Sequence, residues 1–300
     1  MIDGLLKFLN RPRWGHQHTW RKAIWTNMSR LGLTGMHALP VNKRWVEVHR
    51  RAMPLKHLDP GLAGLKVVQI SDLHYSPVVW QKYLIQTLRW VNELEPGLVV
   101  VTGDLITGGY RFASRVATIL SHLRAPYGVV CTFGNHDYSM YGKRTNGEGR
   151  RRADYLETCL KKRGLIVLRN QVIQLTAEKG GTPLSIVGLD DEWSGNIDPQ
   201  KAFAGLDPAT PIICLNHNPA NVRQLMGFPW QWMLSGHTHG RQVGVSPIGR
   251  ALYPNRFRHY THGYYLVGGR HLYVNRGLSY GQRVHEWCRP EITLFTLEAA

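Results

Sequence analysis

Five short motifs rich in His, Asp and Asn are spread through the chain, and each comes directly after an apolar run. They are Asp72-Leu73-His74, Gly103-Asp104, Gly134-Asn135-His136-Asp137, Asn216-His217 and Gly236-His237-Thr238-His239. Carboxylate oxygens, an amide oxygen and imidazole nitrogens without a thiolate suit Mn²⁺, Fe or Zn²⁺ in a two-metal site. Two metal ions about 3.5–4 Å apart stabilise both the attacking and the leaving oxygen in displacement at phosphorus. The motifs therefore predict hydrolysis of a phosphoester.

The apolar runs before the motifs are short and rich in β-branched residues, which predicts buried strands. They cover residues 65–70, 98–101, 128–133, 212–215 and 232–234. Between the first three runs, residues 79–94 and 112–123 have helical patterns, so the strands should pair in parallel with right-handed crossovers. In open α/β sheets ligands bind at the carboxyl ends of the strands, which is where the motifs fall. The face of the first helix that we expect to be buried carries Trp80, Tyr83, Leu84, Leu88 and Val91.

The length and composition fit one large domain. With 300 residues, of which 43% are hydrophobic, the chain can bury a sizeable core without disulfides. The four cysteines have no CxxC spacing, and Cys131 and Cys214 fall inside predicted strands, which favours a reducing compartment. Further apolar runs at 184–187, 265–274 and 292–297 predict a second set of strands.

The beginning of the chain differs in composition, and we divide the sequence into a basic, Trp-rich extension at 1–40 and a domain at 41–300. The extension places Trp14, Trp20 and Trp25 among several Arg and Lys residues. Its apolar run at 2–9 is too short to span a membrane, which takes about 20 residues. Aromatic rings and basic side chains favour peripheral contact with an anionic membrane surface. An ordinary solvated basic extension is the alternative.

The formal net charge of +17 predicts an anionic partner without identifying it. A nuclease would need a basic groove beside the metals, and Arg150, Arg151 and Arg152 could line part of one. The sequence contains no recognised nucleic-acid-binding module, so nucleic acid is not the expected partner. Nothing in the sequence predicts a protein partner.

The order DxH, GD, GNHD, lone His and GHxH resembles the calcineurin-like metallophosphoesterase superfamily, over residues 65–292. The resemblance implies an α/β fold in which a two-sheet β-sandwich is flanked by helices, a four-layer αββα architecture. It implies a bridging role for Asp104, because a carboxylate can serve two cations while offsetting their charge. The implied ligands are Asp72, His74 and His239 for the first metal, and Asn135, His217 and His237 for the second, with Asp104 shared.

The resemblance also implies the chemistry. A water held between the metals should lose a proton near neutral pH, as zinc-bound water does with a pKa of about 7, and the resulting bridging hydroxide is the expected nucleophile. His136 would act catalytically by stabilising phosphoryl charge or protonating the leaving group. Asp137 would orient the His136 ring and favour its charged form. Asp137 could also cap a helix N-terminus, and the two roles are compatible.

A finer resemblance concerns Gly236–Gln242, Ala251–Tyr253 and Tyr273–Leu278. These segments look like the YkuE/YaeI-like subgroup of bacterial membrane-associated phosphoesterases, which includes a UDP-2,3-diacylglucosamine pyrophosphatase of lipid A synthesis. The resemblance implies a lipid-linked diphosphate substrate and a cytoplasmic enzyme, peripheral at the inner membrane face. Arg241 and Arg276 become candidates for substrate binding, although Arg241 replaces the usual Gly and could instead face solvent.

The loop that carries Tyr253, Phe257 and Tyr260 could bind a head group or acyl chain, or could pack on its own aromatic side chains. Two further functions stay open beside the lipid-linked substrate. One is a phosphodiesterase or nuclease that acts on nucleotides or nucleic acid. The other is a non-catalytic scaffold of the same fold.

Overall fold

The computed structural model describes residues 45–77, 79–139, 147–240, 259–279 and 289–300. The predicted extension at 1–40 lies outside the described residues, as do Arg241, Tyr253 and Phe257. The division into extension and domain therefore stays a prediction.

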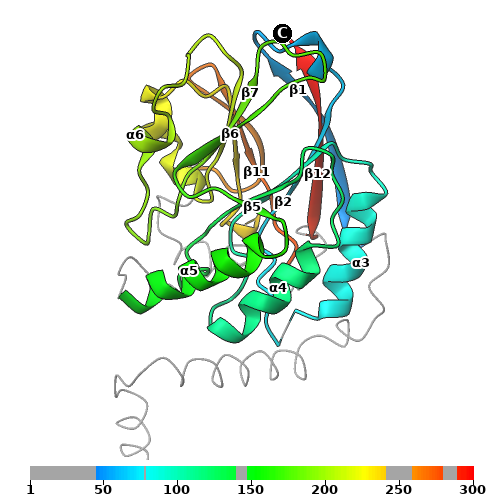
Figure 1. The fold of residues 1–300 in the computed structure, drawn as a ribbon, viewed down its shortest axis with the longest axis vertical. Coiled ribbons are helices and arrows are strands. Elements are labelled where there is room, and N and C mark those ends of the chain that lie inside the picture. The colour runs from blue at the N-terminus through cyan, green and yellow to red at the C-terminus, as the bar shows by residue number, and fades with distance from the viewer. Residues whose placement is uncertain (1–44, 78, 140–146, 241–258, 280–288) are drawn as a thin grey trace, which may run out of the picture. The chain divides into compact units, whose positions relative to one another are not determined.

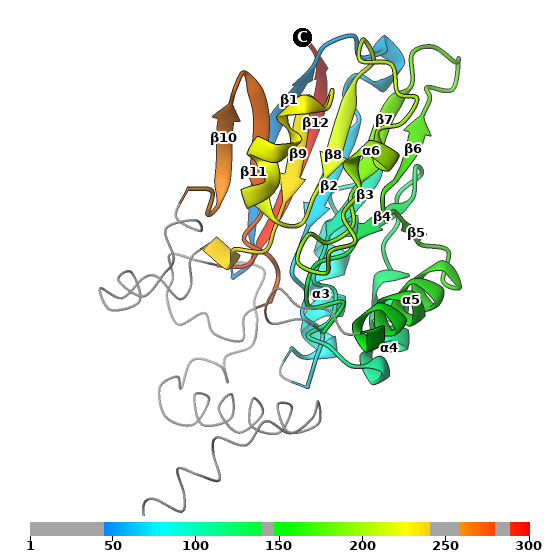
Figure 2. The ribbon, with the colours of Figure 1, turned by 90° about the vertical axis from the view of Figure 1, so that its left-hand side faces the viewer.

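The described residues form two mixed sheets of six strands each (Figures 1 and 2). The first sheet has the order β1 (Glu47–Leu55), β12 (Glu291–Ala299), β2 (Lys66–Ile70), β3 (Leu98–Thr102), β4 (Val129–Thr132), β5 (Ile166–Val167). The second has the order β10 (Gly263–Val267), β11 (Arg270–Val274), β9 (Trp232–Ser235), β8 (Ile212–Leu215), β7 (Leu184–Gly188), β6 (Gln171–Leu175). Strands β2 to β5 pair in parallel, and so do β7, β8, β9 and β11.

The central strands are mostly apolar and almost wholly buried because both faces of each sheet are covered. In β2, Val67 packs in a cluster between the two sheets, whereas Val68 and Ile70 pack in a cluster with the helices. A third cluster covers the outer face of the second sheet, where Val187 of β7 meets Phe203 and Leu225. Successive side chains along β2 thus fill two different layers, and the strand is buried on both faces as the apolar run predicts.

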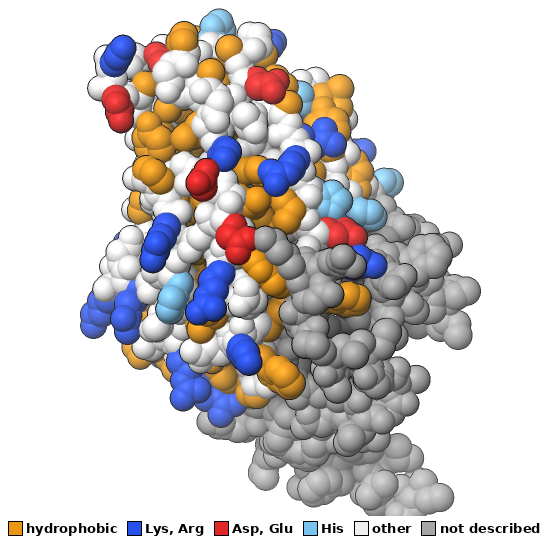
Figure 3. Space-filling model, turned by 90° about the vertical axis from the view of Figure 1, so that its right-hand side faces the viewer, with side chains coloured by type: hydrophobic (Ala, Val, Ile, Leu, Met, Phe, Trp, Pro, Cys, Tyr) orange, Lys and Arg blue, Asp and Glu red, His pale blue; other side chains and the backbone are white. Residues whose placement is uncertain are grey.

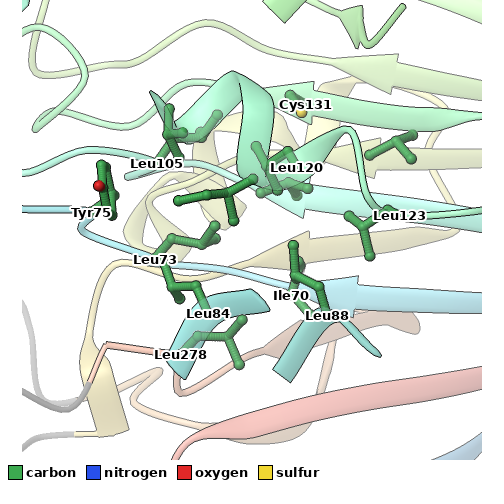
Figure 4. Close-up of a cluster of buried hydrophobic side chains, with 14 of the residues drawn as sticks. Ile70, Leu73, Tyr75, Leu84, Leu88, Leu105, Leu120, Leu123, Cys131 and Leu278 are labelled. Atoms are coloured by element: carbon green, nitrogen blue, oxygen red, sulfur yellow. The ribbon is translucent and has the colours of Figure 1, made fainter. Parts of the chain in front are cut away.

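Helices cover the outer faces of the two sheets and complete the four layers. The first sheet is covered by α3 (Gln81–Asn92), η3 (Tyr110–Phe112), α4 (Ala113–Leu120) and α5 (Gly147–Lys161). On the second sheet lie α6 (Pro199–Ala202) and η4 (Pro219–Gly227), and η2 (Pro60–Leu62) precedes β2. Leu84 and Leu88 of α3 and Leu120 of α4 pack with Ile70 of β2 in one apolar cluster (Figure 4). The predicted two-sheet sandwich flanked by helices is confirmed.

Three details differ from the sequence-based expectation. Trp80 precedes α3 as its N-cap residue and is 54% exposed, so it is not part of the buried stripe. The run at 292–297 belongs to β12, which lies in the first sheet between β1 and β2. The run at 265–274 is an antiparallel hairpin, because Gly268 and Gly269 both adopt positive φ (56° and 79°) and close a tight turn.

Two further expectations concern cysteine and the membrane. Cys131 and Cys214 are buried with free thiols, and burial raises the pKa of each. In the part of the chain that the structure describes, no helix combines the length and the apolar character that a membrane span requires.

Packing of α3 on the first sheet should contribute strongly to stability. Leu84 is fully buried in the helix-facing cluster, and Leu84→Ala should lower the free energy of unfolding by about 2–5 kcal/mol through lost contacts and a residual cavity. The exposed neighbour Lys82 supplies the control, because Lys82→Ala should change stability by less than about 0.5 kcal/mol. Urea denaturation measures both. Equal stability of the two variants would contradict the packing described for α3.

Candidate metal centre

The five motifs meet where β2, β3 and β4 of the first sheet and β8 and β9 of the second end. Their carboxylates and imidazoles form two ligand groups, in each of which the ligand atoms all lie within 4.8 Å of one another. The first ligand group is Asp72, His74, Asp104 and His239, and the second is Asp104, His217 and His237. Asp104 belongs to both groups, which is the position expected of a bridging carboxylate.

The distances between the donor atoms of the first ligand group match those expected around one bound cation. His239 Nε2 lies 3.3 Å from Asp72 Oδ1, His74 Nε2 lies 3.4 Å from Asp104 Oδ2, and the two Nε2 atoms lie 3.1 Å apart. Nitrogen and oxygen ligands that share one ion at about 2.0–2.2 Å lie roughly 3–3.5 Å from each other. The donor atoms therefore have the spacing of a metal site.

The second ligand group is arranged across the two sheets. His217 Nε2 lies 3.3 Å from Asp104 Oδ2 and 3.3 Å from His237 Nδ1. His217 Nδ1 lies 2.7 Å from the carbonyl oxygen of Thr102, to which it can only donate. That hydrogen bond fixes the tautomer and leaves Nε2 available for a metal, a common arrangement behind histidine ligands.

Most residues of the two ligand groups have an unusual backbone conformation with positive φ. Residues other than glycine rarely adopt positive φ, and doing so costs of order 1–3 kcal/mol. Among the six residues of the two groups, all except His217 have φ between 46° and 73°: Asp72, His74, Asp104, His237 and His239. Strain concentrated on the residues that would hold metal indicates that the local backbone is shaped by the site.

At two motif positions other side chains lie so close to the backbone that only glycine fits. A Cβ on Gly134 would lie 2.3 Å from Asp104 Oδ1, and one on Gly103 would lie 2.5 Å from His217 Nδ1. The backbone N–H of His136 donates to Asp104 Oδ1 at 2.9 Å. The GD and GNHD motifs thus approach the shared carboxylate through their backbones.

The two proposed catalytic residues occupy different environments. Asp137 is fully buried, and its carboxylate accepts backbone N–H bonds from Leu105, Ile106 and Gly134 at 2.9–3.1 Å. His136 Nδ1 lies 3.3 Å from the carbonyl oxygen of Thr107. Its ring packs edge-on against His74 with centroids 4.6 Å apart. The carbonyl of Thr107 thus contacts the His136 ring, whereas the Asp137 carboxylate joins the GNHD loop to the segment after β3.

The buried carboxylates and imidazoles of the two ligand groups shift one another's pKa values. Burial alone would raise the pKa of Asp104, but His217, His136 and His74 hold it well below its usual value. Burial lowers the pKa of His217, yet the Asp104 carboxylate outweighs this and raises it to about 10. Burial and the nearby His217 lower the pKa of His237 to about 3. Without metal, a proton on His217 neutralises Asp104, and metal binding there requires its release.

Two further site residues predicted from the sequence, Asn135 and Arg276, lie in the part of the chain that the structure describes. Asn135 is buried between Gly134 and His136, and its role as a metal ligand stays a prediction. The Arg276 guanidinium is in a buried ion pair, with Nε 2.7 Å from Glu291 Oε2, and it also bonds Glu47. Its contact with substrate stays a prediction. The role that the structure shows is anchoring the segment that follows β11.

That segment, residues 275–279, connects the two sheets beside the first ligand group. Its N–H groups bond the carbonyls of Ser235, Ser71 and Asp72 at 2.8–2.9 Å. Gly277 has φ 79°, and a Cβ there would lie 2.5 Å from Asp72 Cβ. The positioning role of this segment was not predicted from the sequence. The sequence feature that could have indicated this role is Asn-Arg-Gly directly after a predicted strand.

A sequence profile described as calcineurin-like phosphoesterase matches residues 65–241. The chain therefore belongs to the calcineurin-like phosphoesterase family and is an enzyme of the metal-dependent phosphoesterase class. It is 34% identical to the uncharacterized metallophosphoesterase YkuE of Bacillus subtilis, over 80% of this chain and 81% of the relative. It is 31% identical to the UDP-2,3-diacylglucosamine pyrophosphatase LpxG of Chlamydia trachomatis, over 78% and 83%. It is 30% identical to the phosphodiesterase YaeI of Escherichia coli, over 84% and 88%.

The shared position of Asp104 generates a prediction about metal content. Asp104→Ala should reduce binding of both metal ions because it removes a ligand from each group, whereas His239→Ala should weaken mainly one. Elemental analysis of the dialysed full chain measures the difference. The exposed His122 provides a control, since His122→Ala removes an imidazole that belongs to neither ligand group. Full metal content in the Asp104 variant would show that the shared assignment is wrong.

Proposed function

We propose that the protein hydrolyses a lipid-linked diphosphate, such as UDP-2,3-diacylglucosamine, with two divalent metal ions. The observation that carries the proposal is the single carboxylate, Asp104, common to two adjacent ligand groups. One metal would be held by Asp72, His74 and His239, the other by Asn135, His217 and His237, with Asp104 on both. The donor set suits Mn, Fe or Zn. Such ions act as Lewis acids on phosphoryl oxygens and lower the pKa of bound water.

His136 is our candidate for the group that acts on the substrate. Its ring lies beside His74 of the first ligand group, and its backbone N–H bonds the shared Asp104. When Nδ1 donates to the Thr107 carbonyl, the charged ring presents its second N–H at Nε2. That proton can stabilise a phosphoryl oxygen or pass to the departing oxygen. Asp137 supports this role indirectly by fixing the loop that carries His136.

The lipid-linked substrate is supported by similarity and by charge. One relative is named as a pyrophosphatase of UDP-2,3-diacylglucosamine, and it aligns over most of both chains. The net charge of +17 favours an anionic surface. On the face drawn in Figure 3, Lys and Arg side chains are more numerous than Asp and Glu. We infer a cytoplasmic enzyme that binds peripherally to the anionic inner face of a membrane.

The nuclease alternative gains no specific support from the described residues. Of the three arginines that could line a basic groove, Arg152 pairs with Glu148 four residues earlier on α5 and lies over the ring of Tyr110. Arg150 and Arg151 are exposed on the same helix, as in an ordinary solvated face.

Replacement of His136 tests the proposed chemistry. His136→Ala should reduce turnover of an aryl phosphodiester roughly 10²–10⁴-fold, the usual loss for a general acid or base, while metal content stays unchanged. His122→Ala, again the control, should retain full turnover. Rates with good and poor leaving groups distinguish the two roles of His136, because proton donation matters most when the leaving group is poor. Unchanged rates with a poor leaving group would exclude proton donation.

The membrane part of the proposal has a separate test. A chain that lacks residues 1–39 should hydrolyse a soluble aryl phosphodiester at nearly the intact rate. It should bind vesicles containing anionic lipid more weakly and turn over UDP-2,3-diacylglucosamine more slowly. Salt should weaken vesicle binding by the intact chain, because the screening length falls to about 3 Å at 1 M. Equal loss on soluble and lipid substrates would assign these residues to the folded core instead.

A further inference from the structure

A loop of the second sheet reaches the second ligand group from outside the five motifs. It covers residues 190–196 and follows β7. Its half-buried Trp193 packs against the His237 ring, with centroids 5.0 Å apart and planes at 81°. Trp193 also packs against the apolar cluster between the first sheet and its helices. The indole therefore lies between a proposed metal ligand of one sheet and the core of the other.

The base of this loop is fixed by buried polar contacts. Asp190 accepts hydrogen bonds from the Tyr138 hydroxyl at 2.6 Å and from Arg169 Nε at 3.0 Å. Asn170 Oδ1 accepts the N–H groups of Asp190 and Asp198, both at 3.0 Å, and its Nδ2 donates to the Asn196 carbonyl at 2.7 Å. One asparagine side chain thus fixes both ends of the loop.

A second set of hydrogen bonds closes the tip of the loop 190–196 around Trp193. The N–H of Ser194 donates to Asp191 Oδ2 at 2.6 Å, and the Ser194 hydroxyl donates to the Asp191 carbonyl at 2.8 Å. Asp191 and Ser194 are both buried. The backbone of the turn that carries Trp193 is thus fixed by hydrogen bonds at both its base and its tip. A rigid support of this kind is what precise placement of a ligand side chain needs.

His237 is placed between two aromatic groups. One is Trp193, and the other is the His217 ring at 5.0 Å and 80°. Edge-to-face contacts prefer one relative orientation of the rings, so they restrict rotation of the imidazole. Residues that orient a metal ligand commonly affect metal affinity without touching the ion.

From this geometry we propose that Trp193 is a positioning residue for His237 and thereby sets the affinity of the second ligand group for metal. The proposal rests on the two-metal function proposed above. Trp193 acts through the orientation of the His237 ring and contributes no atom to the site.

Two substitutions of Trp193 separate ring contact from simple bulk. Trp193→Leu keeps an apolar side chain but removes the ring, whereas Trp193→Phe keeps an aromatic edge. Co²⁺ titration of the full, metal-free chain by calorimetry measures the affinity of each group. The Leu variant should weaken one of the two binding steps about 10–100-fold, as loss of a residue behind a metal ligand typically does. The Phe variant should retain most of the affinity.

Reference variants identify which step has changed. His237→Ala should affect the same step as Trp193→Leu, and His239→Ala the other. Trp80→Ala removes an exposed tryptophan and should leave both steps unchanged. Circular dichroism of each metal-free variant verifies that it is folded.

The outcomes separate this proposal from the one on which it rests. If the wild type binds two ions and the Leu and Phe variants bind both as tightly as the wild type, the proposal for Trp193 is wrong and the two-metal function stands. Equal weakening of both steps by Trp193→Leu would also overturn it, because that pattern indicates general loss of structure. If the wild type binds fewer than two ions, both proposals fail.

Discussion

The candidate metal centre depends on a contact between the sheets, that of His217 with Thr102 and Asp104. His217 follows β8 of the second sheet, and its two ring nitrogens meet the carbonyl of Thr102 and the carboxylate of Asp104, which lie at the end of β3 in the first sheet. The imidazole thereby links the two sheets at their carboxyl ends. This link places Asp104 beside an imidazole of the second sheet, so that the carboxylate belongs to both ligand groups. His217 is also the member of the groups whose backbone needs no positive φ.

The layer between the sheets is built to permit this contact. Along β2 and β3 the side chains in this layer change from Val67, Leu98 and Val100 to the buried polar residues Gln69 and Thr102 near the strand ends. Gln69 Nε2 donates to Thr102 Oγ1 at 3.0 Å and to the Ser235 carbonyl of the other sheet at 2.9 Å. Hydrophobic packing holds the sandwich at one end, and directional hydrogen bonds take over at the other. Directional bonds are suited to a site whose ligand atoms must be placed within tenths of an ångström.

The sequence predicts the parts of this arrangement that are encoded locally. Strands buried on both faces appear as short apolar runs, so β2, β3, β4, β8 and β9 could be located within about a residue, and the motifs after them identified the family. Contacts between segments that are far apart in the chain leave no comparable pattern in the local sequence. The segment 275–279 bonds Ser71 and Asp72 through its backbone, and its Asn-Arg-Gly sequence does not reveal which residues it contacts. Trp80 fits the helical period, but α3 begins one residue later, so the ring is exposed. The position of β12 follows from pairing with β1 and β2 and not from its own composition.

The position of β12 also determines when the fold can be completed during synthesis on the ribosome. Among the described strands it comes last in sequence, yet it lies between the first two, β1 and β2. Until β12 has emerged, β1 has no neighbour in the described sheet and one edge of β2 is unpaired, a condition that favours association with other chains. The same strand carries Glu291, the buried partner of Arg276 in the anchored segment beside Asp72. The support of the first ligand group is therefore synthesised after all of the residues of that group, so in the nascent chain these residues emerge before the strand that helps to hold them.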